Sequence, residues 1–570
     1  MKLLGIHSGH NASACLLVDG KIQIAIQEER LCRIKNYTGF PEMAVKFILD
    51  QARLTMEDVD KVAYTDIYYF NPKIFMEIET AKSHFNRNSP PLAWKIKAAI
   101  EKIKPFGELA TNLRVIRKSN DFQSHGLPKE KLVRVDHHTA HAASAYYGWG
   151  CFEKPVLVLT CDGSGDGLSA TVSIGKNGTL ERIASVQDKY SIGLIYSMAT
   201  LLLGMKPNEH EYKLMGMAPY AHSEDGKKLA KKFSQYFQMD DKNPLGWRTT
   251  SRISDTYCSY QTLRKDFEFE RFDAVCAGLQ LWIEDFLANW VHRCIKHTGI
   301  RSVALCGGVF MNVKANQRIL DLDEVDELFV FPSCGDETNP FGASMLTYAQ
   351  QSGVNNLAPL GPVYLGKAFT DDEINGMLQE KASQYKIECP SNLPRTIAQL
   401  IKNGEVVARF SGRDEFGARA LGNRSILADP SRTDVIRVIN NMIKNRDFWM
   451  PFACSIKSER EKDYIINPKN VTAPYMIITF NTTDRRAEIV AGTHPYDGTA
   501  RPQIVYKEHN PEYHQIISEF ESISGIGAVL NTSFNLHGYP IVHTPDDALQ
   551  VFINSGLKYL TLGSFLISKE

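Results

Sequence analysis

The sequence predicts an α/β fold in two domains. Three observations support this prediction: the chain has 570 residues, a strand–loop–hairpin pattern occurs twice in its first third, and a turn-rich segment divides the rest. A chain of this length exceeds what one ordinary hydrophobic core serves. We therefore expect a first domain over residues 1–360 and a second over residues 361–570.

The first copy of the repeated pattern covers Leu3–Glu28. It consists of an apolar strand, the polar loop SGHNAS, the strand ACLLV, an Asp19-Gly20 turn and the strand KIQIAIQ. The same order returns over Val156–Ile183, with the glycine-rich loop DGSGDG and an Asn177-Gly178 turn. Asp-Gly and Asn-Gly are pairs that tight hairpin turns favour. The repeat predicts two related lobes whose loops offer backbone N–H groups to a phosphate, an arrangement that resembles the duplicated actin-like ATPase superfamily.

The domain junction is expected in the turn-rich segment Gly353–Gly366, just before the capping-box residues Thr370–Glu373 that predict a helix start. Two other segments have distinctive composition. Lys82–Lys131 is rich in Lys and Arg and contains Trp94, a pattern most typical of solvated helix faces. His222–Gln261 is polar and turn-rich, and we expect it to be an excursion able to cover a cleft.

Composition narrows the class of protein. The chain has 65 basic and 65 acidic side chains, which argues against a protein whose affinity depends on a nucleic-acid backbone. The 11 cysteines include no C-x-x-C pair and are scattered, as expected of reduced thiols. The apolar run at the start is too short for a signal peptide, and no 18-residue apolar segment follows. We therefore expect a cytoplasmic protein without a membrane span.

Four side chains are candidate metal ligands. His137 and His141 lie four residues apart in the helix-compatible segment VDHHTAHAASAYY and would project from one face, whereas His138 would point elsewhere. Asp162 closes the strand VLVLTC, and Asp336 follows the apolar strand LFVFP. Two imidazoles with two carboxylates suit Fe(II), Mn(II) or Zn(II) better than Mg(II). The alternative for the two histidines alone is a pair packed at a helix start.

A second group of residues is a candidate nucleotide contact. Gly307 and Gly308 separate an apolar strand from a predicted helix that carries Asn312. Glycines let the backbone approach a nucleotide closely, and the start of the helix favours its phosphates. Lys213, close to Gly216, is a further candidate phosphate contact, and an ordinary surface lysine is the equally weighted alternative.

The predicted second domain concentrates cations among small residues, in four turn-rich motifs. Guanidinium groups bind phosphate and carboxylate oxygens through paired hydrogen bonds, so several of them in such settings predict a site for a small, doubly charged anion. The candidate residues are Arg419, Arg424, Lys444, Arg446, Arg501 and Asn531.

Taken in order, these motifs resemble the O-carbamoyltransferases of the NodU/CmcH type, which modify antibiotics, toxins and nodulation factors. The resemblance covers nearly the whole chain. It implies a first domain similar to the actin-like domain of the tRNA threonylcarbamoyl transferases. It also implies an α+β second domain similar to the enzymes that make threonylcarbamoyl-adenylate.

The resemblance further implies a reaction with two sites. The second domain would use carbamoyl phosphate and ATP to make carbamoyl-adenylate, and the first would transfer the carbamoyl group to a hydroxyl of a small-molecule natural product. Carried over to this sequence, the second site consists of Arg419, Lys444, Arg446, Arg501 and Asn531. The metal, iron, would be held by His137, His141, Asp162 and Asp336, and the nucleotide of the first site by Gly307, Gly308 and Asn312.

His10 in the SGHNAS loop matches a family histidine near the acceptor, and we expect it to act as general base. Asn11 stands where the family commonly has Asp, and Met450 where it commonly has Arg. The alternative functions are a tRNA-modifying transferase of the threonylcarbamoyl type or its partner protein, and a non-catalytic nucleotide-binding regulator. A homodimer is the base-rate expectation for the assembly.

Overall fold

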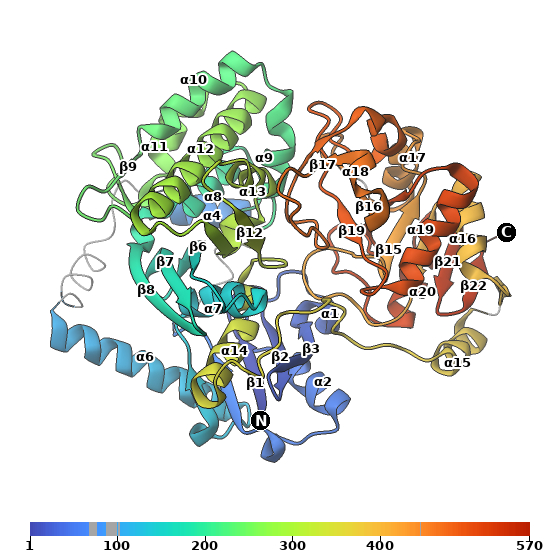
Figure 1. Cartoon of the computed structure of the whole chain (residues 1–570), viewed down its shortest axis with the longest axis horizontal. Helices are drawn as coiled ribbons and strands as arrows, with labels where there is room; N and C mark the ends of the chain where they lie inside the picture. The colour runs from blue at the N-terminus through green and yellow to red at the C-terminus, as the bar shows by residue number, and fades with distance from the viewer. Residues whose placement is uncertain (68–76, 87–99, 101–102, 383, 445, 570) are drawn as a thin grey trace. The chain divides into compact units, whose positions relative to one another are not determined.

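The structure is a computed structural model that describes residues 1–67, 77–86, 100, 103–382, 384–444 and 446–569 (Figure 1). Part of the basic stretch Lys82–Lys131, including Trp94, therefore lies outside the described residues.

The described chain forms two compact units, which are treated separately below. The first unit comprises Met1–Ile24 and Asn36–Gly361, and the second comprises Ala25–Lys35 and Pro362–Glu570. The division after Gly361 falls in the turn-rich segment. Residues 25–35, which the sequence analysis placed in the first domain, belong to the second unit instead.

The first sheet has the strand order β3-β2-β1-β4-β5 in the described part of the chain. Its strands are β1 (Lys2–His7), β2 (Ser13–Val18), β3 (Lys21–Gln27), β4 (Lys61–Tyr64) and β5 (Leu132–Arg134). β1 pairs antiparallel with β2 and parallel with β4, and β4 pairs parallel with β5. The carboxyl ends of β1 and β4 therefore lie at the same edge of the sheet.

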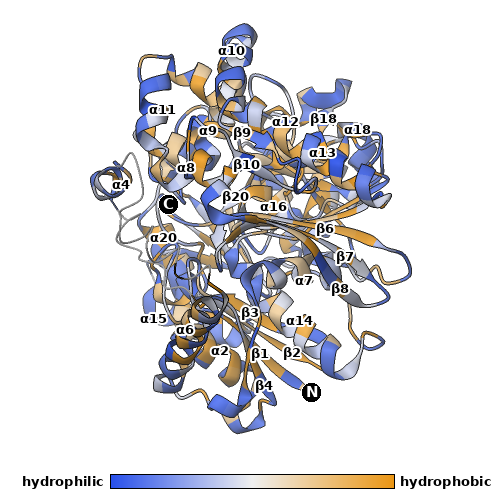
Figure 2. Cartoon of the chain, turned by 90° about the vertical axis from the view of Figure 1, so that its left-hand side faces the viewer, coloured by the Kyte–Doolittle hydropathy of each residue, from blue (hydrophilic) through white to orange (hydrophobic). Residues whose placement is uncertain are grey.

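The second sheet repeats this topology among the described residues, in the order β12-β11-β6-β7-β8. Its strands are β6 (Val156–Gly165), β7 (Leu168–Lys176), β8 (Thr179–Gln187), β11 (Ser302–Cys306) and β12 (Glu327–Val330). β6 pairs antiparallel with β7 and parallel with β11, as β1 does with β2 and β4. The predicted duplication of the β-unit is thus confirmed. Strands β1, β2 and β6 are strongly apolar, whereas the edge strand β8 is largely exposed and carries polar residues (Figure 2).

Helices accompany both sheets of the first unit. They are α2 (Glu42–Ala52), α4 (Ile78–Phe85), α6 (Lys104–Ser124), α7 (His137–Trp149), α8 (Ile192–Leu202), α9 (Glu211–Met217), α10 (Ser223–Ser234), α11 (Tyr260–Phe267), α12 (Phe272–Thr298), α13 (Val313–Leu320) and α14 (Asn339–Ser352). α7 and α14 pack at a close crossing, because a Cβ at Gly342 would lie 1.8 Å from the carbonyl oxygen of Ala140. α14 also presses on β1, where a Cβ at Gly5 would lie 2.4 Å from the carbonyl oxygen of Pro340.

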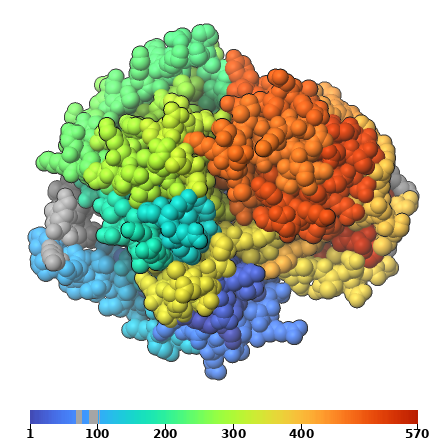
Figure 3. All heavy atoms as spheres, in the orientation of Figure 1, coloured from blue at the N-terminus to red at the C-terminus, as the bar shows by residue number. Residues whose placement is uncertain are grey.

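The polar segment His222–Gln261, which we expect to be an excursion able to cover a cleft, is folded into helices and a hairpin. It forms α10, the short hairpin of β9 (Phe237–Met239) and β10 (Trp247–Thr249), and the start of α11. Its aromatic side chains are buried against α12, where Trp247 and Trp290 pack edge to face. Most residues of α10 are hydrophilic (Figure 2), and the atoms of this segment form part of the face seen in Figure 3, where they are green. Buried aromatic contacts thus hold this polar segment against α12.

The second unit contains one mixed sheet of eight strands in its described part, ordered β13-β22-β21-β14-β15-β20-β16-β19. Its strands are β13 (Lys386–Glu388), β14 (Val407–Phe410), β15 (Arg424–Ala428), β16 (Ala453–Lys457), β19 (Gln503–Val505), β20 (Ala528–Ser533), β21 (Tyr559–Leu562) and β22 (Phe565–Ser568), with β17 (Ile465–Ile466) and β18 (Asn481–Thr482) as a separate pair. Its helices are α1 (Glu28–Cys32), α15 (Asp371–Lys381), α16 (Leu393–Lys402), α17 (Asp434–Ile439), α18 (Glu461–Tyr464), α19 (Pro511–Ser524) and α20 (Pro545–Ile553). Apolar side chains of β14, β15, β20 and β21 pack with α15, α17 and α20 in its core.

Candidate metal centre and anion-binding site

Helix α7 positions the two candidate histidine ligands. The helix begins after Asp136, whose carboxylate accepts a hydrogen bond of 3.0 Å from the Thr139 N–H, and it ends at Gly150 in the left-handed conformation. His137 and His141 lie one turn apart on one face, and their Nε2 atoms are 3.1 Å from each other. Both side chains are buried. The predicted histidine pair is therefore built by one well-capped helix.

Two carboxylates complete the cluster. Asp162 lies on β6, and Asp336 begins the short 3₁₀ helix Asp336–Thr338 that follows β12. The Asp162 Oδ2 atom is 3.4 Å from His137 Nε2 and 3.1 Å from His141 Nε2. The Asp336 Oδ1 atom is 3.5 Å and 3.4 Å from the same two nitrogens. These distances are near the roughly 3.4 Å edge of a tetrahedron with bonds of about 2.1 Å. One ligand atom from each of the four residues lies within 4.8 Å of the others, so the four side chains could hold a transition-metal ion.

The electrostatics of the cluster also suit a cation. Burial would raise the pKa of the Asp162 carboxyl, but hydrogen bonds from His137 and His141 hold it well below its ordinary value. Burial would lower the pKa of His137, but the charges of Asp66 and Asp336 raise it well above its ordinary value. The Asp162 carboxylate therefore stays ionised, and a metal ion would replace protons on the imidazoles.

The next shell of side chains contains residues that the sequence analysis did not identify. Asp66 Oδ1 lies 2.7 Å from His137 Nδ1, and Cys306 Sγ lies 3.4 Å from His141 Nδ1. Both residues sit at strand ends, Asp66 just after β4 and Cys306 at the end of β11. Their position at the carboxyl ends of short apolar strands is the feature of the sequence that could have predicted them. His138 turns away as expected and bonds the Thr160 hydroxyl at 2.8 Å.

The glycine turn expected to contact nucleotide lies beside the metal cluster. Gly307 has a φ of 105°, and a Cβ there would lie 2.3 Å from the Cys161 carbonyl oxygen, so this position requires glycine. A Cβ at Gly308 would lie 3.0 Å from Asp162 Oδ1. Asn312 caps α13, with its Oδ1 accepting from the Ala315 N–H at 3.1 Å. Its side-chain oxygen already has a structural task, so any nucleotide contact would come from the surrounding backbone.

The candidate phosphate contact Lys213 and the candidate general base His10 also lie in the first unit. Lys213 lies on α9, partly buried. His10 lies in the loop between β1 and β2, and its carbonyl oxygen is 2.9 Å from His7 Nε2. Asn11 next to it has a φ of 57°, a left-handed conformation that asparagine tolerates well.

In the second unit, three arginines form a cluster of like charge. Burial lowers the pKa of the Arg501 guanidinium well below its ordinary value, and the charges of Arg419 and Arg446 lower it further. Burial likewise lowers the pKa of Lys444, with Arg446 and Lys35 adding to the effect. Like charges gathered in a poorly solvated place favour a bound anion. Lys35, from the segment 25–35, thus joins the candidate anion-binding cations, and the sequence did not predict it.

Lys444, in the helical turn Asn440–Lys444 that follows α17, and Asn531, on β20, support this cluster. The Lys444 ammonium donates to the Ser533 hydroxyl and to the Asn535 backbone and side-chain oxygens. The Asn531 amide nitrogen donates to the Ala420 carbonyl at 3.1 Å and to the Ser455 hydroxyl at 2.9 Å. Its Oδ1 atom is buried without a hydrogen-bond partner among the described residues.

Arg424 departs from its expected role as a direct anion contact. It is fully buried, its guanidinium donates to the carbonyl oxygens of Ser411 at 2.8 Å and Gly412 at 3.2 Å, and it lies over the Phe410 ring. Asp414 and Glu415 are its nearest charge partners. Because its two Nη groups donate to backbone carbonyls, Arg424 holds the loop that carries Arg419, while its Nε atom is buried without a hydrogen-bond partner among the described residues.

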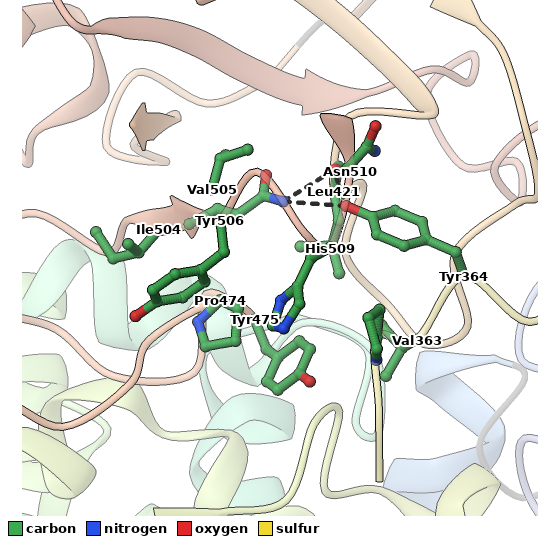
Figure 4. A pocket seen from close by; sticks show the side chains of 12 residues that line it. Val363, Tyr364, Leu421, Pro474, Tyr475, Ile504, Val505, Tyr506, His509 and Asn510 are labelled. Atoms are coloured by element: carbon green, nitrogen blue, oxygen red, sulfur yellow. Dashed lines mark hydrogen bonds between the residues drawn. The ribbon is translucent and has the colours of Figure 1, made fainter. Parts of the chain in front are cut away.

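A small pocket adjoins the arginine-bearing segments (Figure 4). Its lining includes Tyr364, Tyr475 and Tyr506, together with Leu421 and Gln503. The Gln503 amide donates to the Leu421 carbonyl at 2.8 Å. Leu421 and Gln503 each follow an arginine of the cluster by two residues, so the pocket wall and the cation cluster share the same two chain segments.

Membrane insertion has no candidate segment in the described part of the chain, where every helix is too short or too polar to cross a bilayer.

Comparison with known proteins agrees with this two-part organisation. Residues 2–345 match the family model described as carbamoyltransferase N-terminus, and residues 398–569 match the one described as carbamoyltransferase C-terminus. An uncharacterized protein of Synechocystis is 30% identical over 100% of this chain and 96% of its own length. An uncharacterized protein of Methanocaldococcus jannaschii is 31% identical over 100% and 99%. Nodulation protein NolNO of Sinorhizobium fredii is 30% identical over 98% of this chain and 79% of its own. The chain therefore belongs to the carbamoyltransferase family, as its motifs predicted.

Proposed function

We propose that this carbamoyltransferase is an ATP-dependent enzyme that carbamoylates a hydroxyl of a small-molecule natural product. Its second domain makes carbamoyl-adenylate, and its first domain transfers the carbamoyl group. Family membership supports carbamoyl transfer. The separate metal and cation clusters, one in each unit, support two sites.

In the second domain, carbamoyl phosphate, ATP and one water give carbamoyl-adenylate, phosphate and pyrophosphate. Hydrolysis releases phosphate and leaves carbamate, whose oxygen attacks the α-phosphorus of ATP and displaces pyrophosphate. Arg419, Arg446 and Arg501 bind the phosphate oxygens, and Lys444 adds positive charge nearby. The observation that carries this assignment is the unpartnered, buried Oδ1 atom of Asn531, a suitable acceptor for the carbamoyl –NH₂.

In the first domain, the acceptor hydroxyl oxygen bonds to the carbamoyl carbon while the bond from that carbon to the adenylate oxygen breaks. The products are the carbamoylated acceptor and AMP, and the hydroxyl proton passes to the His10 imidazole. Gly307 and Gly308 let the backbone approach the nucleotide, with the backbone around Asn312 and the Lys213 side chain as its further contacts.

His137, His141, Asp162 and Asp336 hold the metal, which we assign as Fe(II), with Mn(II) and Zn(II) as the other ions this donor set suits. A bound divalent cation supplies stabilisation of the negative charge that develops on the reacting carbamoyl oxygen. We place the enzyme in the cytoplasm, where carbamoyl phosphate and ATP are available, and expect a homodimer.

The second-domain assignment is tested by Arg501→Ala. Loss of a charge-assisted contact costs about 1.5–3 kcal/mol, so phosphate release from carbamoyl phosphate with ATP, without acceptor, should fall at least about ten-fold. Transfer from supplied carbamoyl-adenylate should persist. Arg432→Ala, which removes an exposed arginine paired with Asp434, is the matched control and should leave both rates unchanged. Undiminished phosphate release by Arg501→Ala would refute the assignment.

The first-domain assignment is tested by Asp336→Ala. This substitution removes one of four metal ligands, so transfer to the acceptor should be abolished while phosphate release by the second domain continues. Both half-reactions are followed in the same metal-supplemented preparation. Simultaneous loss of the two activities in a folded variant would contradict the two-site scheme.

A further inference from the structure

Asp66 occupies an unusual place at the edge of the first sheet. It follows β4 by two residues, at the edge where β1 also ends. Its φ of 63° is a left-handed conformation that is uncommon for residues other than glycine and that recurs at functional sites. The side chain is nevertheless buried in the protein. A buried carboxylate held in a strained backbone conformation requires strong partners to offset its cost.

Both oxygens of this carboxylate have such partners. Oδ1 lies 2.7 Å from His137 Nδ1, and Oδ2 lies 2.9 Å from His7 Nδ1. Because an ionised carboxylate only accepts hydrogen bonds, the His137 Nδ1 atom must donate. The His137 Nε2 atom, which faces Asp162 and Asp336, then provides the lone pair for a metal ion. The Asn339 amide, at 3.4 Å from His137 Nδ1, is a more distant neighbour.

The second partner, His7, continues the contact toward the loop of His10. His7 Nε2 donates to the His10 carbonyl oxygen at 2.9 Å. A Cβ at Gly9 would lie 2.8 Å from the His7 ring, so the loop backbone rests directly on this imidazole. One carboxylate thus orients a metal ligand on one side and, through His7, the backbone of the His10 loop on the other.

The two ligand histidines are not supported equally. The Nδ1 atom of His141 faces the Cys306 sulfur at 3.4 Å, and a thiol is a weak acceptor compared with a carboxylate. A carboxylate on the far nitrogen of a ligating histidine fixes the ring and strengthens its lone pair as a donor to metal. His137 is therefore the better prepared ligand of the pair.

We propose that Asp66 is the positioning residue of the metal centre: it fixes the His137 ring with Nε2 toward the metal and, together with His7, holds the His10 loop beside it. This inference rests on the proposed metal site. It assigns to Asp66 and His7 a task outside direct contact with metal or substrate.

The test measures metal affinity of the full-length, metal-stripped chain. Dissociation constants for Co(II) and Zn(II) are determined by competition with a chromophoric chelator, for the unmodified protein and for Asp66→Asn. We expect about 10–100-fold weaker binding by Asp66→Asn, and an altered visible spectrum of bound Co(II) because the His137 ring is less constrained. Equal affinity with an unaltered spectrum would overturn the inference.

Asp50→Asn is the matched control. It removes the same charge at an exposed position of α2 in the same unit, outside the histidine–aspartate cluster, so metal affinity should stay unchanged. If the unmodified chain binds neither metal, the metal site of the proposed function is itself wrong. Tight binding by the unmodified chain together with unchanged binding by Asp66→Asn overturns only the role of Asp66.

His7→Gln keeps the inference testable should Asp66→Asn fold poorly, which chemical denaturation of the metal-free variants detects. This substitution leaves Asp66 in place but removes the imidazole that contacts the Asp66 Oδ2 atom. We expect weaker metal binding than in the unmodified chain, with a smaller loss than in Asp66→Asn. Unchanged affinity in a folded His7→Gln would overturn the role of His7.

Discussion

In the candidate metal centre, neighbouring side chains determine whether each buried histidine is protonated, and through this they affect the free energy of unfolding. In the metal-free chain, burial would lower the pKa of both His137 and His141. The charges of Asp66 and Asp336 raise the pKa of His137 well above its ordinary value, and Cys306, together with hydrogen bonds to Asp162 and Asp336, does the same for His141. His138, on the same turn, is buried without a carboxylate partner, and burial with its charged neighbours lowers its pKa to about 3. Neighbouring histidines of similar burial therefore differ in charge because their partners differ.

This difference predicts the pH dependence of stability in the metal-free chain. A group whose pKa is raised on folding stabilises the fold fully below its ordinary value, here 6.5, and that stability is lost as pH rises through the raised pKa. The free energy of unfolding should therefore fall from neutral to alkaline pH. Urea denaturation of chelator-treated protein measures it, and His137→Gln should flatten the slope. An equal slope in that variant would contradict the assignment.

At the scale of elements, the metal ligands depend on how closely α7 approaches its neighbour α14. The helices touch at Gly342, where a side chain would occupy the position of the Ala140 carbonyl oxygen. Ala140 lies between His137 and His141 on α7, so the depth of this crossing sets the position of both ligands. Two helices that cross at a glycine have little freedom to adjust.

Gly342→Ala should therefore destabilise the chain by about 1–3 kcal/mol and weaken metal binding, since α7 must move away. Urea denaturation and chelator competition measure the two effects. Gly376→Ala is the control, because Gly376 lies in α15 with open space around its Cβ position. That change should be neutral or stabilise by about 0.5–1 kcal/mol. Equal effects of the two substitutions would contradict this account of the crossing.

At the scale of the whole molecule, the second unit takes a segment from the beginning of the chain. Arg30, buried within residues 25–35, donates to the Gly417 carbonyl at 2.8 Å, in the loop that carries Arg419. Arg33 donates to the Ile541 and Pro540 carbonyls at 2.7 Å and 3.0 Å. Burial would raise the pKa of the Asp414 carboxyl, but His543, and with it Arg424 and Arg30, holds it at about 2. The second unit is thus incomplete as the single range 361–570.

Replacing Arg30 should show this dependence. Arg30→Gln removes a positive charge near the buried Asp414 carboxylate, so the free energy of unfolding should fall by on the order of 3 kcal/mol. It also removes the hydrogen bond to the Gly417 carbonyl and so loosens the loop that carries Arg419. We expect a lower urea midpoint and a higher KM for carbamoyl phosphate in the phosphate-release assay. Lys46→Gln, at an exposed position on α2, is the control and should change neither. Unaltered stability and KM for Arg30→Gln would refute the anchoring role.

Short stretches of the sequence predict the hairpins of both sheets and the types of the candidate site residues. Turn pairs such as Asp19-Gly20 and Asn177-Gly178 mark both hairpins, and the spacing of His137 and His141 marks a helical face, because these features depend on neighbouring residues alone. The same holds for the arginine motifs, which predict an anion site from residue type alone. Local patterns therefore predicted the duplicated sheets and the four candidate ligands.

Other features depend on contacts between distant parts of the chain. Asp66 meets His137 across 71 positions, and Arg30 meets Gly417 across 387. Nothing near Arg424 distinguishes it from Arg419, yet it is buried under backbone carbonyls while Arg419 joins the cation cluster. Periodicity and turn chemistry act over a few residues, whereas burial, desolvation and charge pairing are set by whatever the folded chain brings alongside. For that reason the elements and ligand types follow from the sequence, and the partners that orient the ligands follow from the fold.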